Sequence, residues 1–255
     1  RASEAALKYL LFGALASSLM LFGISWLFGL TGTLSFPELL HAVSVSGQAP
    51  TAGQAAPAIT LAGFFLFVGL AFKVSMVPCP MWTPDVYEGA PVPVTALLSV
   101  GPKAAGLALL IRSTEALRPL WPSLAPLILV LTVVTMTLGN VAALSQTNVK
   151  RLLAYSTIGQ VGYLLIGFAV NTRDGIAALL VYLVAYLFMN LGAFACVTAV
   201  VNDTGSESIE AFRGLSRRSP GLALVCALFL LSLAGIPPLL GLLGKFLLFG
   251  SAVQT

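Results

Sequence analysis

The stretch LAGFFLFVGLAFKVSMVPCP, residues 61–80, decides the fold class of this chain. It begins as a continuous apolar run, carries one charge at Lys73, and ends at Pro78-Cys79-Pro80. A run of about 20 apolar residues is long enough to cross the hydrocarbon core of a bilayer as a helix. Because proline lacks a backbone N–H, Pro78 and Pro80 break that helix at its end. The stretch therefore predicts a transmembrane helix that is broken next to a lysine.

The composition of the rest of the chain agrees with a membrane protein. Hydrophobic residues make up 58% of the 255 positions and charged residues 9%, and the mean hydropathy is +0.98. A soluble domain carries about 25% charged residues, so this chain cannot cover a water-facing surface. The apolar runs are continuous rather than alternating, which argues against a membrane β-barrel. We expect an all-α, polytopic transmembrane helix bundle.

The apolar runs predict about seven transmembrane segments in a single membrane domain that spans residues 1–255. They cover residues 5–30, 57–77, 93–111, 122–144, 152–170, 175–201 and 220–250, and residues 31–56 are expected to form a loop. The chain begins at Arg1 without a methionine and ends just after an apolar run. We therefore interpret it as a fragment of a longer protein.

The basic residues predict which side of the membrane each loop occupies. With seven segments, the side that holds the N-terminus receives seven basic residues: Arg1, Lys8, Lys150, Arg151, Arg213, Arg217 and Arg218. The opposite side receives three, namely Arg112, Arg118 and Arg173. Since cytoplasmic loops are enriched in Lys and Arg, the N-terminal side is expected to be cytoplasmic. This bias explains the net charge of +4, so we expect no nucleic-acid partner.

A second broken helix is predicted near the end of the chain. The run 220–250 is interrupted at Gly235-Ile236-Pro237-Pro238, and Lys245 follows the break. In the predicted topology this segment runs opposite to residues 57–77. Paired interrupted helices in two halves of a sequence indicate the ion path of a transporter, and opposite directions indicate an inverted repeat. Backbone groups freed by the breaks need protein or water partners.

Three lysines inside apolar segments are the candidate proton carriers: Lys73, Lys103 and Lys245. A charge at the bilayer centre costs at least ~3 kcal/mol, so such residues usually face a bundle interior or a wet cavity. Surroundings of low dielectric constant favour the neutral amine, which lets a lysine accept and release a proton at neutral pH. We expect a relay of the three lysines connected by water. The alternative is that a lysine extends to the membrane interface.

Other polar residues receive structural interpretations. Asp85 and Glu88 are expected to cap or orient the segment after the first break. The prolines are expected to break the two helices: Pro78 and Pro80 the first, Pro237 and Pro238 the second. Glu115 is expected to pair with Arg112 and Arg118 on the surface, and His41 to be a solvated loop residue. Cys79, Cys196 and Cys226 lack ligand spacing, so no metal site is expected.

Polar residues occur both before and within the segment 152–170. The polar residues 145–148 precede Lys150-Arg151 and predict a capped helix start. Within the segment, polar side chains form a stripe that hydrogen-bonds neighbouring helices or hydrates a channel: Tyr155, Ser156, Thr157, Gln160 and Tyr163. No nucleotide-binding loop, HExxH, CxxC or serine-triad pattern occurs, so this chain is expected to perform no redox chemistry itself.

Two longer motifs resemble a known family. Residues 72–78, FKVSMVP, followed by residues 82–91, WTPDVYEGAP, resemble the antiporter-like membrane subunits of respiratory complex I. Residues 143–156, ALSQTNVKRLLAYS, resemble them too. Within that family, the sequence of residues 83–91, together with SVGPKA at residues 99–104, is most similar to the subunit N type of proton-translocating NADH:quinone oxidoreductase. The resemblance covers essentially the whole chain.

The resemblance implies a fold with two inverted five-helix repeats, of which this chain holds the sixth to twelfth helices. Lys73, Lys103 and Lys245 match the family's lysines on the seventh, eighth and twelfth helices, with roles as internal carrier, central connector and exit-side carrier. The family pairs the first lysine with a glutamate on its fifth helix, upstream of Arg1; Glu4 is not that residue. Cys79-Pro80 replaces the family's common Phe-His, which removes any histidine relay there.

The resemblance also implies the setting in which the chain works. It predicts a multi-pass subunit of a bacterial inner membrane, with a thylakoid membrane as the alternative, that moves protons beside other membrane-arm and peripheral subunits of complex I. FMN, iron–sulfur clusters and quinone belong to those partners, and this chain binds no cofactor. The alternative functions are a subunit of a multisubunit cation/proton antiporter and a non-pumping scaffold. Residues 83–91 favour complex I, and the three lysines argue against a scaffold.

Overall fold

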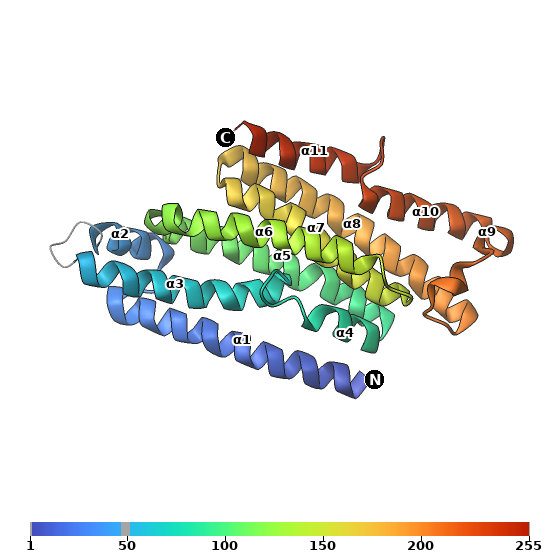
Figure 1. The fold of residues 1–255 in the computed structure, drawn as a ribbon, viewed down its shortest axis with the longest axis horizontal. Helices are drawn as coiled ribbons and strands as arrows, with labels where there is room; N and C mark the ends of the chain where they lie inside the picture. Colours follow the sequence, from blue (N-terminus) through green and yellow to red (C-terminus); the bar gives the residue numbers. More distant parts are fainter. Residues whose placement is uncertain (1, 47–51, 255) are drawn as a thin grey trace.

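The structure, a computed structural model, describes residues 2–46 and 52–254 (Figure 1). These residues form helices and connecting turns, with no strand among them beyond an isolated bridge between Asn148 and Ser208. The long helices run side by side along the bundle axis in Figure 1. They are α1 (Ala2–Thr31), α3 (Ala52–Val74), α5 (Val92–Ala116), α6 (Trp121–Ala143), α7 (Val149–Val170) and α8 (Arg173–Thr204). The predicted all-α class is confirmed.

The outside of this bundle is apolar. Large hydrophobic side chains are exposed on every long helix except α7, for example Leu10, Leu97, Leu129 and Phe188. Within the described residues, six helices are long and apolar enough to cross a membrane. An apolar surface of this extent is stable only against lipid or other protein, so the bundle is membrane-embedded.

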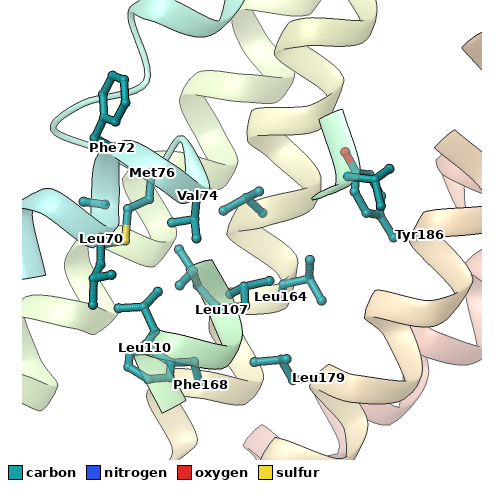
Figure 2. Close-up of a cluster of buried hydrophobic side chains, with 14 of the residues drawn as sticks. Leu70, Phe72, Val74, Met76, Leu107, Leu110, Leu164, Phe168, Leu179 and Tyr186 are labelled. Carbon is teal, nitrogen blue, oxygen red and sulfur yellow. The ribbon is translucent and has the colours of Figure 1, made fainter. Parts of the chain in front are cut away.

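The centre of the bundle is the cluster shown in Figure 2. Leu164 and Phe168 of α7 lie among Leu107 and Leu110 of α5 and Leu70 of α3, and all five are buried. This apolar packing fixes α7 as the central helix, next to α5, α6 and α8. Polar side chains on α7 are thereby held at the middle of the protein.

The predicted loop over residues 31–56 is wrong, because much of it is helical. Helix α2 covers Phe36–Ser46, and α3 begins at Ala52; residues 47–51 lie outside the described part of the chain. Leu39 and Val43 are one helical turn apart and both are buried, so a short apolar face holds α2 against the bundle. His41 is exposed, as predicted, but lies on this helix.

Both predicted breaks are present, and both broken helices have the same C-terminal geometry. Helix α3 ends at Val74 before α4 (Trp82–Gly89), and α10 (Pro220–Ala234) ends before α11 (Leu240–Val253). Ser75 and Gly235 adopt left-handed backbone angles, with φ of 65° and 90°. The following amides return to the helix, Met76 N to Ala71 O and Ile236 N to Leu231 O, which is the Schellman cap.

The first break begins earlier than predicted. The sequence placed it at Pro78-Cys79-Pro80, whereas the left-handed Ser75 already ends the helix. The buried Ser75 hydroxyl accepts a hydrogen bond from Thr83 Oγ1 at 2.8 Å, which holds this turn against α4. In Figure 1, α3 runs in the direction opposite to α10 and α11. This is the antiparallel arrangement expected of inverted repeats.

Candidate proton-transfer site

Lys103 lies at the centre of the candidate site and is fully buried. Its Nζ donates to the Tyr87 hydroxyl at 2.8 Å and to the Leu98 carbonyl oxygen at 3.2 Å. It also lies 4.9 Å from the centre of the Trp82 ring and 5.2 Å from that of Tyr87. Among the described residues, no carboxylate forms an ion pair with it. Lys103 is thus held by a hydroxyl, a carbonyl and two aromatic faces.

The short helix α4 builds that environment because the first break places it there. Trp82 Nε1 donates to the Phe72 carbonyl oxygen at 3.0 Å, and Val77 N donates to Thr135 Oγ1 at 3.0 Å. These bonds satisfy backbone groups that the break frees, as membrane burial requires. Trp82 and Tyr87 are both buried, so α4 presents its aromatic side to Lys103.

The predicted burial of Lys73 is wrong. Its side chain is exposed and makes no hydrogen bond, ion pair or ring contact with any described residue. The neighbouring Ala71, Phe72 and Val74 occupy the buried positions at this end of α3, which leaves Lys73 on the uncovered side. Its base is close to α5 all the same, because a Cβ added at Gly106 would lie 3.4 Å from the Lys73 Cβ.

Lys245 lies beside the second break and is only partly buried. Its Nζ donates to the carbonyl oxygens of Leu233 at 3.0 Å and Ala234 at 3.1 Å. The ammonium also lies 4.4 Å from the centre of the Tyr163 ring. Leu233 and Ala234 are the last residues of α10, so Lys245 donates hydrogen bonds to carbonyl oxygens that the break leaves without helical partners.

A cavity of about 650 Å³ adjoins Lys245. Its polar lining includes Asn140, Gln146, Ser156, Gln160 and Tyr163. This volume is ample for several water molecules, each of which needs about 30 Å³. The second break therefore lines a space that water can occupy.

Two sets of buried polar groups, one beside Lys103 and one beside Lys245, lie on adjacent turns of α7. The Tyr186 hydroxyl lies 3.1 Å from the Ser99 carbonyl oxygen and 3.2 Å from Thr157 Oγ1, and Thr157 also interacts with the Tyr87 hydroxyl. One turn further along α7, Gln160 accepts from the Tyr182 hydroxyl and donates to the Leu233 carbonyl oxygen at 2.9 Å. Leu233 O is the same atom that binds Lys245.

Of the two roles that the sequence left open for the stripe on α7, hydrogen bonding to neighbouring helices is confirmed, and hydration of a channel stays a prediction. Thr157, Gln160 and Tyr163 hydrogen-bond residues of neighbouring helices, and Ser156, Gln160 and Tyr163 line the cavity. A matching polar stripe on α8 was not predicted. Tyr182, Tyr186 and Asn190 recur every four residues in an otherwise apolar run, and Asn190 donates to Ser99 Oγ at 2.6 Å. That spacing was the available signal, because residues four apart share one helix face.

Asp85 and Glu88 belong to an ion-pair network rather than a helix cap. Helix α4 has no side-chain cap, so the predicted capping role is wrong. Arg151 contacts Asp85 at 3.1 Å and Glu88 at 2.9 Å, and Lys8 contacts Asp85 at 2.8 Å and Glu4 at 2.9 Å. The network links α1, α4 and α7, and it lines a cavity of about 220 Å³.

Lys150 was predicted only as one of the basic residues on the cytoplasmic side, whereas its side chain is 3% exposed. Its Nζ lies 2.6 Å from Glu207 Oε1 and donates to the Ala90 carbonyl oxygen at 2.9 Å. The predicted cap next to it is confirmed, since Asn148 accepts from the amides of Lys150 and Arg151. No periodicity in the sequence signals the partner, because Glu207 lies 57 residues further along the chain in a loop.

The remaining predicted residues lie at the surface or in apolar packing. Arg112 pairs with Glu115 at 3.6 Å, and both are exposed. Pro80 is buried, whereas Pro78, Pro237 and Pro238 are exposed. Cys196 and Cys226 are buried and Cys79 is partly buried; all three are free thiols. Among residues 2–46 and 52–254, no group of three or more His, Cys, Asp or Glu side chains is placed to hold a metal ion.

A membrane bundle with two oppositely directed broken helices, each next to a lysine, defines an antiporter-like transmembrane protein. Residues 1–255 match the family described as "NADH:quinone oxidoreductase/Mrp antiporter, TM". The chain belongs to this family.

Three similar proteins set the chain within the family. NADH-quinone oxidoreductase subunit N 2 of Sorangium cellulosum is 47% identical, over 100% of this chain and 52% of its own length. NAD(P)H-quinone oxidoreductase subunit 2 of Prochlorococcus marinus is 49% identical, over 98% of this chain and 46% of its own. A chain of respiratory complex I from Thermus thermophilus superposes with a TM-score of 0.78 at 37% identity, over 98% of this chain and 52% of that one. The chain thus spans about half the length of these relatives.

Proposed function

We propose that this chain is a proton-translocating membrane-arm subunit of an NADH:quinone oxidoreductase, that is, of complex I. The observation that carries the proposal is Lys103, which is buried without an acidic partner among the described residues and adjoins hydroxyls that lead toward Lys245. The 47% identity to NADH-quinone oxidoreductase subunit N 2 supports the assignment to complex I.

Tyr87 suits Lys103 as a proton-transfer partner. A phenol hydroxyl both donates and accepts hydrogen bonds, so it can accept from an ammonium and donate to a neutral amine without moving away. Thr157 and Tyr186 extend the set of reversible hydroxyls. Gln160, the cavity of about 650 Å³ and Lys245 follow on the far side. A proton that leaves Lys103 can therefore pass through hydroxyls and water to Lys245.

Lys73 takes a different position in this scheme. Its exposed ammonium has no partner among the described residues, and such a charge at membrane depth needs water or an acid. The resemblance to the family supplies a candidate, the glutamate on the family's fifth helix. Approach of that carboxylate stabilises the ammonium, and its withdrawal favours proton release toward Lys103.

The partners of the chain follow from the same assignment. FMN, iron–sulfur clusters and quinone belong to other subunits, and this chain contributes lysines, hydroxyls and a water-accessible cavity. Its membrane is the bacterial inner membrane. The 49% identity to NAD(P)H-quinone oxidoreductase subunit 2 of Prochlorococcus marinus keeps a thylakoid location as the alternative.

The experiment is purification of the tagged protein from its native membrane in mild detergent, followed by an assay of NADH:quinone reductase activity. The proposal predicts that inhibitor-sensitive reductase activity copurifies with the tag. A preparation without redox activity that exchanges sodium for protons after reconstitution would contradict it and assign the chain to the cation/proton antiporters.

A further inference from the structure

The polar end of the bundle contains a second site, built on Lys150 and Glu207, that the lysine relay does not use. Figure 1 shows the N-terminus of α1, the short helix α4 and the loop after α8 at the same end of the molecule. That loop is paired with the chain before α7, since Val149 N donates to Glu207 O and Ile209 N donates to Thr147 O, both at 2.9 Å. The pairing fixes Glu207 next to Lys150.

The two carboxylate oxygens of Glu207 face different partners. Oε1 lies 2.6 Å from Lys150 Nζ, and Oε2 accepts from Asn148 Nδ2 at 3.3 Å. The Glu207 side chain is 31% exposed, whereas that of Lys150 is 3% exposed. The pair therefore joins an acid in contact with water to an amine in the protein interior.

A polar cavity of about 780 Å³ adjoins this pair. Its lining includes Glu88, Asn148, Lys150, Ser206 and Glu207. Glu88 also lines the smaller cavity of the ion-pair network around Arg151. Carboxylates that line a water-filled space are suited to exchange protons with it, because they bind and release protons quickly.

Two structural links lead from Lys150 toward Lys103, one through α4 and one along α7. Lys150 Nζ binds the Ala90 carbonyl, and Tyr87, three residues earlier on α4, binds Lys103. On α7, Lys150 and Thr157 are seven residues apart and thus on one face, about 10 Å apart along the axis. Thr157 interacts with the Tyr87 hydroxyl. Because the Lys150 side chain leans toward the start of α7, the proposed path needs a short row of water molecules to cover this distance.

We infer that the Lys150–Glu207 pair is the site through which protons pass between the aqueous phase at this end and Lys103. The Lys150 ammonium gives its proton inward to the water and hydroxyls at Thr157 and Tyr87 and becomes a neutral amine. Glu207 takes a proton from the cavity and passes it to that amine, which restores the original pair. One proton thus moves from the cavity to the interior. This inference rests on the proposed function.

The test uses the complete protein with its partners in native membrane vesicles and measures donor-driven acidification in H₂O and in D₂O. Lys150→Arg keeps the charge and the ion pair but does not release a proton. Glu207→Gln keeps the side-chain shape but removes the proton-accepting oxygen. We expect each change to lower proton pumping about tenfold or more, with a larger solvent isotope effect and unchanged amounts of assembled protein. Glu210→Gln is the matched control, because Glu210 lies in the same loop in an exposed pair with Arg213.

Full pumping by either variant at normal assembly would overturn the inference. So would a loss of activity with an unchanged isotope effect, because a purely structural role slows H₂O and D₂O reactions equally. Failure of the proposed function gives a different result, since the unmodified protein would then pump no protons at all.

Discussion

Lys103 is stabilised by aromatic rings and neutral oxygens, and it forms no ion pair with any described residue. The contacts come from Trp82, Tyr87 and the Leu98 carbonyl. A cation over an aromatic face gains about 2 kcal/mol when desolvated, and hydrogen bonds to a charged group add about 1.5–3 kcal/mol each. Loss of the proton therefore leaves no buried carboxylate unpaired. This arrangement lets Lys103 exist in both charge states without rearrangement of the core.

Tyr87→Phe tests the hydroxyl in this arrangement. Removal of a hydrogen bond worth about 1.5 kcal/mol corresponds to roughly tenfold in rate. We expect the pumping rate to fall by about that factor while assembly is kept. Tyr9→Phe is the matched control, since the Tyr9 ring packs on Trp82 at 5.1 Å between centroids but does not touch Lys103. Equal rates for the two variants would argue that the Tyr87 hydroxyl takes no part.

The sequence identified Lys103 correctly as buried but failed for Lys73, and the reason is physical. An apolar run shows that a lysine lies at membrane depth, but the sequence around Lys73 and Lys103 does not show whether each lysine faces the core or the outside of the bundle. The segments around both lysines are apolar on all sides, so no periodic pattern separates a core-facing from an outward position. Tertiary packing of α1, α4 and α5 decides which lysine is covered.

At the level of elements, α6 and α7 pack with their backbones in close contact. A Cβ added at Gly162 would lie 2.6 Å from Met136 N and 2.7 Å from Met136 Cα. Small residues at a helix interface permit such an approach, which is the usual means of tight packing in membranes. The contact positions Thr157 and Gln160, which lie on the turns just before Gly162.

Gly162→Ala is therefore expected to destabilise the bundle by about 1–3 kcal/mol, because the added methyl group forces the two helices apart. Thermal unfolding of the detergent-solubilised protein measures the effect as a lower melting temperature. Gly29→Ala provides the control, since a Cβ at Gly29 meets nothing within 4 Å. An equal melting temperature for the two variants would contradict the tight α6–α7 contact.

The two breaks show what local sequence can and cannot predict. Gly235 is a residue that adopts left-handed angles without strain, and it marks the end of α10 as predicted. Ser75 takes the same conformation without such a signal, so the end of α3 was placed too late in the chain. The bond from Thr83 to Ser75 depends on where α4 packs. Long-range packing is therefore the cause of that error.

For the whole molecule, the exposed apolar shell and the distribution of basic residues define an orientation. Lys8, Lys150, Arg151 and the loop after α8 lie at the end of the bundle that holds the N-terminus of α1. The fold class and both breaks were predictable because hydropathy and proline positions encode them directly. Helix α2 and the Lys150–Glu207 pair were not predicted, since a short amphipathic stretch is a weak signal and the pair joins residues far apart in sequence.

Cysteine labelling tests the orientation. Ser216 lies in the short helix α9 (Leu215–Arg218) and Ser35 lies just before α2; both are exposed, and the two helices are at opposite ends of the bundle in Figure 1. The enrichment of Lys and Arg predicts that the end with Ser216 faces the cytoplasm. We expect a membrane-impermeant maleimide to label Ser35→Cys in intact cells and Ser216→Cys only after permeabilisation. The reverse labelling pattern would show that the orientation is inverted. The unmodified protein, with Cys196 and Cys226 buried, gives the background.

The most direct test of the central claim is proton pumping by Lys103→Ala in the complete protein with its partners, measured as donor-driven acidification of membrane vesicles. Arg112→Ala is the control, because the contacts of the exposed Arg112, an ion pair with Glu115 and a cation–π contact with Phe36 at 5.8 Å, do not involve Lys103. A relay through Lys103 predicts that Lys103→Ala assembles normally but loses pumping, whereas Arg112→Ala pumps like the unmodified protein. Normal pumping by an assembled Lys103→Ala complex would contradict the relay.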